Sequence, residues 1–595
     1  MDLATLKSFK AAEYEEAAAG YRSAGDTAMA AKDTIDNRIS AGMRDRLKGD
    51  AVTAALRELQ SLSKNFHYAQ TECTLVGTAL NGFAFDMAAA KRKLDTAIED
   101  ARADGCTVRA DGSVSYPGGS RPGAEKNTPG GTVSGGAGGD PTAAALEQQA
   151  MAQHPNPYYG RALTYANRVV EALKEATDAD AKWAPKLRAL RADDDLTVSK
   201  QDWADTQSDM GNVREAGRAY VDSLPDIPKD ATPAVNAAWW NALDPEQQAA
   251  WLSLQPGTVG ALDGLPATVR DEANRLVFEG DRGRLQMELN SIPPAPPEKT
   301  WMVVGGRASQ VYTDEWIAWN AKYGDRVERL NKSLKGMQSI QARFDRTGER
   351  GLPEAYLLGF SPEGNGRAIV ANGNPDTADH QAVYVPGTTS NLASIAGDIG
   401  RMENVWRVAA AEGNGSVSTI TWLGYDAPQD VVKDAPFSHY ADDGAPAYNR
   451  FLDGLEASHT GASDPHRTAI GHSYGTTLIG SAARQGDLNA DDVILAGSPG
   501  VQVSNAEKLD VPRGHVWNQE ADKDPVPDIG RWGHGGHDWR VGVFIIPSDD
   551  HFGANQLNTD TQGHSDYWKE NTESLRNQGM VVAGNGGNAK LKPTE

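Results

Sequence analysis

The spacing of apolar residues changes once along the chain, near residue 350. Before that point apolar side chains recur every three or four positions, as on one face of a helix. Two such stripes are Leu56, Leu59, Leu62 and Phe66, and Leu75, Leu80, Phe83 and Met87, which Leu94 and Ile98 extend. After about residue 353, short β-branched runs alternate with stretches of helical character. We therefore predict a largely α-helical first part and an α/β second part.

The helical part divides where the composition changes. Residues 1–105 are rich in Ala, Glu, Lys and Leu, and they predict a hairpin or bundle of long antiparallel helices. Gly, Ser and Pro dominate from Pro117 on, so we predict that residues 106–141 form a flexible linker or a poorly ordered loop, with a short hairpin first at the DGSVSYP segment. Residues 142–350 predict a second helical domain.

Two local patterns refine the second helical domain. Asp244-Pro245-Glu246 predicts an N-cap followed by proline at the first helical position. The proline-rich SIPPAPPEKT at 291–300 ends one helix, and a further helix is predicted over 313–345.

Seven short apolar runs in residues 353–585 predict buried strands. Each is β-branched and ends in Gly, Pro or Asp, and helical stretches separate most of them. The runs are 355–360, 366–373, 381–387, 416–424, 467–471, 491–500 and 514–522. This alternation predicts a doubly wound, mostly parallel sheet with helices on both faces, and we assign 586–595 to a C-terminal tail.

A serine between two glycines stands where the fifth of these runs meets a helix. The stretch RTAIGHSYGTT places Ser473 between Gly471 and Gly475. Such a turn lifts the serine hydroxyl clear of a sheet edge, and the small residues let the turn pack. The N-terminus of the following helix favours negative charge beside the hydroxyl. We expect Ser473 to be a nucleophile; the alternative is a glycine-rich turn with an idle serine.

A serine nucleophile needs a histidine base and a carboxylate that orients the base. With the serine on such an elbow, the acid follows it in the chain and the histidine comes last. We choose Asp524 as the acid, because it comes just after the strand HVWNQ, at the edge where a catalytic carboxylate belongs. Asp522 and Glu520 remain alternatives for this role.

His564 is our choice for the base. It lies in a glycine-bounded loop just before an amphipathic helix, near the end of the α/β part. His534, His537 and His551 are the other candidates. His472 is expected to pack or to face the substrate, because its Cβ points away from that of Ser473.

Two backbone amides are expected to hold the oxyanion that forms during acyl transfer. One is the amide of Tyr474, the residue after the nucleophile. The other should come from YVPGTTSN, the loop after the third strand, where Thr388 would donate and Gly387 would permit close backbone approach.

Composition narrows the function classes. The net charge of −23 argues against nucleic-acid binding and against a basic membrane-surface helix. The two cysteines, Cys73 and Cys106, exclude a disulfide scaffold and a cysteine-rich zinc site, and whether they pair stays open. We find no Sec-type signal peptide and no apolar stretch of about 18 residues, so we expect no transmembrane segment. The protein is then cytoplasmic or exported without a Sec signal.

Six ordered motifs resemble an actinobacterial α/β-hydrolase family that was first catalogued as a domain of unknown function. They are YVPGTTS, TWLGYDAP, GHSYGTT, AGSPG, DPV and GHSDYW, within about 353–585. The resemblance implies the α/β-hydrolase fold and a triad of Ser473, Asp524 and His564. The tryptophan-rich block that starts at WWNALDPEQQ resembles the helical segment that often precedes this domain.

Residues 1–105 more loosely resemble the WxG-type helical hairpins exported by type VII secretion. The turn Leu47-Lys48-Gly49 has leucine where tryptophan is usual, and no Tyr-x-x-x-Asp/Glu signal follows the second helix. A helical accessory domain is the alternative for this region.

The sequence thus predicts a serine hydrolase without a cofactor, acting on a small-molecule or lipid-like ester, thioester or amide. Esters come first because the family resembles lipases and esterases. The alternative is a non-catalytic or secretion-associated protein whose N-terminal helices bind a helical partner. A third hypothesis is metal-dependent hydrolysis through His534 and His537 near Asp538, although we expect no metal.

Overall fold

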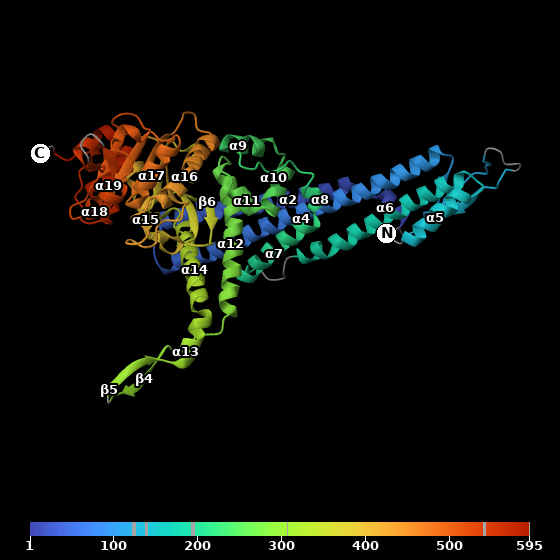
Figure 1. Ribbon diagram of the computed structural model, residues 1–595, viewed down its shortest axis with the longest axis horizontal. Helices are drawn as coiled ribbons and strands as arrows, with labels where there is room; N and C mark the ends of the chain where they lie inside the picture. The colour runs from blue at the N-terminus through green and yellow to red at the C-terminus, as the bar shows by residue number, and fades with distance from the viewer. Residues whose placement is uncertain (122–126, 137–140, 192–196, 306, 539–542, 594–595) are drawn as a thin grey trace.

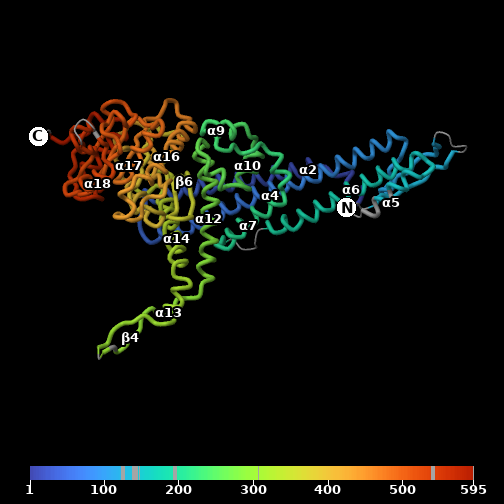
Figure 2. Tube along the Cα trace, in the orientation of Figure 1, coloured from blue at the N-terminus to red at the C-terminus, as the bar shows by residue number. Residues whose placement is uncertain are grey.

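The computed structural model describes the chain apart from residues 122–126, 137–140, 192–196, 306, 539–542 and 594–595. The molecule is elongated. The α/β part forms one end, and long helices extend from it to the other end (Figure 1). The Cα trace in Figure 2 shows the N-terminus among these helices and the C-terminus at the α/β end.

A long helical hairpin forms the N-terminal part. A short helix α1 (Leu3–Ser8) precedes α2 (Ala11–Asp33), which continues through a π-helical turn at Thr34–Ser40 into α3 (Ala41–Arg46). The chain then reverses at residues 47–49, as predicted, and α4 (Asp50–Ala103) runs back along α2. The two helices approach closely because small residues face each other: a Cβ on Gly77 would lie 3.0 Å from the carbonyl oxygen of Ala18.

The apolar character of helix α4 bears on the expectation that the chain has no transmembrane segment. Within the residues that the structure describes, it is the one helix long and apolar enough to cross a membrane. Packing against α2 and α6 (Tyr158–Ala189) buries 56% of its most apolar window inside the protein. Polar residues such as Asn81 and Asp86 interrupt this window, so it is not an unbroken apolar run, and burial in the helical core accounts for its apolar character.

The segment predicted as a Gly/Ser/Pro linker, 106–141, contains a small antiparallel sheet, which includes the hairpin predicted at DGSVSYP. Its strands are β1 (Thr107–Val108), β2 (Val114–Tyr116) and β3 (Gly131–Val133). Val114 is fully buried against Ala162 and Ala166 of α6. Gly130 allows close strand pairing, because a Cβ there would lie 2.4 Å from the Tyr116 carbonyl oxygen. Cys106 packs in the same cluster, and both it and Cys73 are free thiols.

The second region is mostly helical, as predicted, apart from one hairpin. Its helices before the α/β part are α5 (Pro141–Gln153), α6, α7 (Lys200–Ala216), α8 (Arg218–Val221), α9 (Pro233–Ala242), α10 (Pro245–Leu254), α11 (Pro256–Gly260), α12 (Ala267–Ser291), α13 (Asp314–Trp319) and α14 (Asp325–Phe344). Asp244 caps α10 as predicted. Its side chain accepts from the Gln247 backbone amide, and the Gln247 side chain accepts from the Asp244 backbone amide. A hairpin of β4 (Lys299–Val304) and β5 (Arg307–Tyr312) was not predicted.

The α/β part is built on an eight-stranded sheet. Its strands are β6 (Ala355–Ser361), β7 (Arg367–Asn372), β8 (His380–Val385), β9 (Val417–Leu423), β10 (His466–His472), β11 (Asp492–Ala496), β12 (Val516–Gln519) and β15 (Asn555–Gln556). The order is β15-β12-β11-β10-β8-β9-β7-β6. The pairs β6–β7 and β7–β9 are antiparallel and the others are parallel. All seven predicted strands are present; β15 is additional.

Helices cover both faces of this sheet, which confirms the predicted doubly wound fold. On one face α16 (His439–Ser458) and α17 (Tyr474–Gln485) bury apolar residues such as Phe451 and Leu478. On the other face α15 (Ile395–Ala411) and α19 (Glu573–Val582) contribute Met402 and Val581. The remaining elements are α18 (Val526–His534) and the hairpin β13 (Gly536–Asp538) with β14 (Val543–Ile545).

Helix α12 joins the helical region to the sheet by binding the backbone of the edge strand β6. Asp271 accepts from the Leu357 amide at 2.6 Å, and Asn274 donates to the Leu357 carbonyl at 3.0 Å. Arg275 donates to the carbonyl of Ala355 at 2.8 Å. Side chains of α12 thus form hydrogen bonds with backbone amide and carbonyl groups of β6 that would have no partner on an uncovered edge strand.

Candidate active site

Ser473 lies on a strained turn between β10 and α17. Its backbone has φ 53° and ψ −127°, a conformation that L-residues rarely adopt. The flanking glycines explain how the turn fits: a Cβ on Gly471 would lie 2.8 Å from the backbone of Thr476, and one on Gly475 would lie 2.1 Å from the Val385 carbonyl oxygen. The Ser473 amide donates to the Ala496 carbonyl at 2.9 Å, which ties the turn to β11.

Asp524 and His564 form a hydrogen-bonded pair. His564 Nδ1 lies 3.0 and 2.9 Å from the two carboxylate oxygens of Asp524, whose side chain is fully buried. Because an ionised carboxylate only accepts, Nδ1 carries the proton in this pair and Nε2 is left as the basic nitrogen. Asp524 comes from the turn after β12 and His564 from the loop before α19, as the sequence predicts.

Further hydrogen bonds hold the Asp524 carboxylate. The Tyr567 hydroxyl donates to it at 2.6 Å and the Val526 amide at 3.0 Å. Burial raises the pKa of Asp524, but the hydrogen bonds from His564, Tyr567 and Val526 outweigh burial, so its pKa lies below the ordinary value. The carboxylate therefore stays ionised at neutral pH. We did not assign a role to Tyr567 from the sequence, although it stands in the same GHSDYW motif as His564.

His472 positions the histidine loop. Its Nε2 lies 2.8 Å from the His564 carbonyl oxygen, and the two imidazole rings are 4.7 Å apart. Its Nδ1 lies 3.4 Å from a guanidinium nitrogen of Arg401. Arginine can only donate, so Nδ1 accepts and Nε2–H donates to His564. Burial, with Arg401 and His564 nearby, holds the pKa of His472 well below its ordinary value, which keeps this ring neutral.

His564 lies close to the turn that carries Ser473. His564 lies against His472, the neighbour of Ser473, and a Cβ on Gly497 would lie 3.0 Å from the His564 ring. Gly497, at the end of β11, has φ +57° and leaves the space that the ring occupies. No hydrogen bond joins the Ser473 hydroxyl to His564 in the described part of the chain. Ser473 keeps 8% of its surface exposed, so the hydroxyl lies in a nearly closed site.

The predicted oxyanion loop reaches the serine. A Cβ on Gly387 would lie 2.7 Å from the Ser473 Cβ and 3.3 Å from its Oγ, so only glycine fits there. Tyr474 is the first residue of α17, where amides lack helical acceptors. Within the described residues, the amides of Tyr474 and Thr388 have no hydrogen-bond acceptor. Both are therefore free to bind an anion.

A loop over residues 427–438 contacts the residue after Ser473 and the predicted oxyanion loop. The Tyr474 hydroxyl donates to the Phe437 carbonyl at 2.5 Å, and the Thr389 amide donates to the Pro428 carbonyl at 2.7 Å. This loop and the neighbouring α18 expose apolar side chains to solvent: Val431, Val432, Phe437, Ile529 and Trp532, each more than half exposed. The tryptophans of α9 and α10 form a separate core with Tyr220 and Leu224.

The alternative candidates lie in other environments. Asp522 is exposed, and its carbonyl accepts from the Gly563 amide at 2.8 Å, so its backbone anchors the histidine loop. His534 Nε2 contacts the Ala435 carbonyl oxygen at 2.7 Å, and His551 is exposed. Among the residues that the structure describes, His, Cys, Asp and Glu side chains form no group of three suited to a metal ion. The side chain of Asp538 lies outside the described residues.

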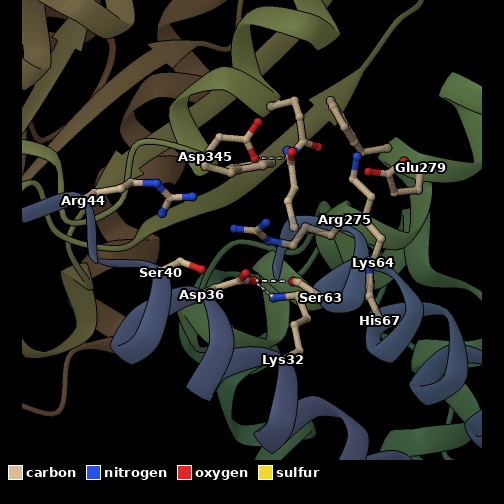
Figure 3. A pocket seen from close by; sticks show the side chains of 14 residues that line it. Lys32, Asp36, Ser40, Arg44, Ser63, Lys64, His67, Arg275, Glu279 and Asp345 are labelled. Atoms are coloured by element: carbon tan, nitrogen blue, oxygen red, sulfur yellow. Dashed lines mark hydrogen bonds and ion pairs between the residues drawn. The ribbon is translucent and has the colours of Figure 1, made fainter. Parts of the chain in front are cut away.

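A separate polar cavity lies between the helical hairpin and helices α12 and α14 (Figure 3). It encloses about 610 Å³ of empty space, part of it open to solvent. Its charges are partly paired within the protein, since Lys32 lies 3.3 Å from Asp36 and Ser63 donates to Asp36 at 2.8 Å. None of its lining residues comes from the sheet or from the loops around Ser473, so it is distinct from the candidate active site.

Comparison with known proteins agrees with this fold. Residues 361–533 match the model of a family described as alpha/beta hydrolase. An uncharacterized protein of Mycobacterium tuberculosis strain H37Rv is 29% identical over 382 residues, which cover 58% of this chain and 55% of the relative. An uncharacterized protein of Mycobacterium bovis is 37% identical over 178 residues, 28% of this chain and 66% of the relative.

This chain spans little more than half the length of the first of these relatives. Both relatives are uncharacterized, so neither indicates an activity. The family match covers strands β7 to β12 together with Ser473 and Asp524, while His564 lies beyond it. The C-terminal part of this chain is an α/β-hydrolase domain preceded by a largely helical region.

Proposed function

We propose that the C-terminal domain is a serine hydrolase that cleaves esters through an acyl-enzyme intermediate. The observation that carries this proposal is the buried Asp524 carboxylate bonded to His564 Nδ1 beside the strained Ser473 turn. A hydrolase on this fold needs these three groups in this order along the chain.

In the proposed reaction His564 Nε2 takes the proton of the Ser473 hydroxyl as Oγ attacks the ester carbonyl carbon. The amides of Tyr474 and Thr388 stabilise the resulting oxyanion, and losing one such donor typically costs about 3 kcal/mol of transition-state stabilisation. His564 then gives the proton to the leaving alkoxide, which departs as the alcohol. Water repeats the sequence on the acyl-enzyme and releases the carboxylic acid.

The surroundings of the site favour an ester with an apolar acyl or alkyl group. Phe437 is 57% exposed and Trp532 is 75% exposed, and both belong to segments that border Ser473 or Asp524. Exposed apolar groups around a nearly closed site offer contact area to an apolar substrate. Lipid-like esters are therefore our preferred class.

The test is turnover of p-nitrophenyl esters whose acyl chains run from acetyl to dodecanoyl. The purified full-length protein is expected to hydrolyse them, with kcat/KM rising with chain length, and Ser473→Ala should remove the activity. Equal turnover by the folded Ser473→Ala variant, or no turnover of any chain length, would favour the non-catalytic alternative. A preference for acetyl esters would contradict the lipid-like class alone.

A further inference from the structure

The β4–β5 hairpin projects from the body of the molecule. Figure 1 shows it beyond α13, at the far end of the α12–α14 helix pair, and the trace in Figure 2 shows the same arm standing clear of the helices and the sheet. The hairpin pairs from Lys299 with Tyr312 to Val304 with Arg307. Six residues per strand extend the arm by about 20 Å.

The base of this arm is firmly held. Pro293, Pro294, Pro296 and Pro297 enter it from α12, and their rings restrict the backbone. Thr313 follows β5 at the base of the arm. Its side chain donates to the Pro297 carbonyl at 2.6 Å, and its amide donates to the Glu298 carbonyl at 3.1 Å. Trp319 donates to the Pro293 carbonyl at 2.8 Å. The arm is thus a stiff extension that cannot fold its tip back onto the body without losing these contacts.

Apolar side chains occupy both faces of the outer half of the arm. Trp301 and Val303 point to one face and Met302 to the other, because neighbouring side chains of a strand alternate. Their exposed fractions are 68%, 72% and 53%, respectively. A protein partner that covers one face would leave the other in water. Lipid surrounds an inserted tip on all sides and so accounts for both faces.

The arm is basic, whereas the whole chain is strongly acidic. Lys299 and Arg307 are its only charged residues between 299 and 312, although the chain carries a net charge of −23. The base adds an aromatic pair, Tyr312 stacked on Trp316 at 4.8 Å, with Lys299 over the Tyr312 ring at 5.0 Å. Aromatic rings and cations next to an apolar tip match the layer of a bilayer where headgroups meet acyl chains.

We propose that the β4–β5 arm is a membrane-docking element whose apolar section, Trp301 to Val303, termed the tip here, inserts into the interfacial layer of an anionic bilayer. Lys299, on the body side of these residues, and Arg307, which pairs with Val304 on their distal side, then contact lipid phosphates through their long side chains. The acidic body stays at a distance, because the arm is longer than the screening length of about 8 Å at physiological salt. This inference rests on the arm and does not depend on catalysis at Ser473.

The experiment is co-flotation of the full-length protein with lipid vesicles. All variants carry Ser473→Ala so that lipid hydrolysis cannot alter the vesicles. The vesicles are phosphatidylcholine alone or phosphatidylcholine with a quarter of phosphatidylglycerol. The Ser473→Ala protein should float with the anionic vesicles, and adding Trp301→Ser, Met302→Ser and Val303→Ser should lower the partition coefficient at least tenfold, about the contribution of one buried apolar side chain.

Two further variants sharpen the result. Leu47→Ser with Val235→Ser removes side chains that are 51% and 50% exposed on other surfaces, and it should leave binding unchanged. Lys299→Gln with Arg307→Gln should weaken binding to anionic vesicles and abolish the difference between the two vesicle types. Because the arm lies outside the core, equal thermal unfolding midpoints should accompany these changes.

Three outcomes would overturn the proposal. One is failure of the protein to float with anionic vesicles, and another is equal binding by the tip variant. The third is a dimer in lipid-free light scattering that the tip substitutions convert to a monomer, without vesicle binding, since the arm would then serve a second copy of the chain.

Discussion

At the scale of single residues, Asp524 and Asp522 lie two positions apart but have different environments. The Asp524 side chain is fully buried and bonded to His564, whereas Asp522 is exposed. Asp524→Asn keeps the shape but favours the wrong histidine tautomer, so we expect kcat on the preferred ester to fall by about 10³–10⁴-fold. Asp522→Asn is the matched control and should stay within a few-fold of wild type. Equal losses in the two variants would remove Asp524 from its proposed role.

Gly387 is a second residue whose size matters. An added Cβ would meet the Cβ of Ser473 at 2.7 Å and the His472 carbonyl oxygen at 2.8 Å. Gly387→Ala must therefore displace the oxyanion loop or the serine, and we expect kcat to fall at least about tenfold, with a smaller change in KM. Gly397→Ala in α15 is the control, because a Cβ there meets nothing within 4 Å. Steady-state kinetics on the two variants test this, and unchanged kcat in Gly387→Ala would contradict the placement of the loop.

At the scale of elements, the sequence predicted regular structure where burial of apolar residues or a local helix cap determines it. The seven buried strands are apolar runs of the right length, and the helix capped by Asp244 carries its start signal locally. The arm strands β4 and β5 were missed because their outward apolar residues bury nothing in this chain. The hairpin predicted at DGSVSYP is formed by β1 and β2. Strand β3 was missed because its glycine-rich surroundings have the composition of a linker.

The candidate site was predictable to a similar extent. The order of Ser473, Asp524 and His564 follows from spacing along the chain relative to the strands. The contacts of Tyr567 with Asp524 and of Arg401 with His472 join residues from different elements, so no local pattern reveals them. Such contacts depend on how α15 and the histidine loop pack, which periodicity does not specify.

The packing of α4 against α7 contains a buried acid, Glu72, which accepts from the Thr206 hydroxyl at 2.7 Å. Burial raises its pKa to about 7. The unfolded chain loses this proton near pH 4.5 and the folded protein near 7, so the free energy of unfolding falls as pH rises between these values and stays lower above them. Glu72→Gln removes the titration. We expect it to raise the unfolding midpoint relative to wild type at pH 8 and to change it little near pH 4.5.

The size of this effect is on the order of 1–3 kcal/mol at pH 8. Glu58→Gln, on an exposed part of the same helix, provides the control and should shift the midpoint little at either pH. Thermal unfolding followed by circular dichroism measures the difference. A Glu72→Gln protein less stable than wild type at pH 8 would contradict the assigned protonation.

At the scale of the whole molecule, hydrogen bonds join the helical region to the hydrolase domain, across the domain boundary predicted near residue 350. Asn274 of α12 is 2% exposed and donates to the carbonyls of Gly260 and Leu357. Asn274→Ala leaves both carbonyls without this donor, and we expect a loss of about 1–3 kcal/mol for each that stays buried. Amide hydrogen exchange should then quicken along β6 as well as α12.

Asn290→Ala tests whether this effect is specific, because Asn290 lies on the exposed end of the same helix. It should alter neither the unfolding midpoint nor exchange in β6. If Asn274→Ala changes exchange in α12 but leaves β6 as in wild type, the helix does not stabilise the edge strand.

The central claim is that the Ser473 hydroxyl is a nucleophile activated by His564. Reaction of the folded full-length protein with a fluorophosphonate, followed by peptide mass spectrometry, measures this directly. We predict one phosphonyl group per chain, on Ser473, formed much more slowly in His564→Ala and not at all in Ser473→Ala. A folded wild-type protein that stays unmodified at neutral pH, or that carries the label on another residue, would contradict the account.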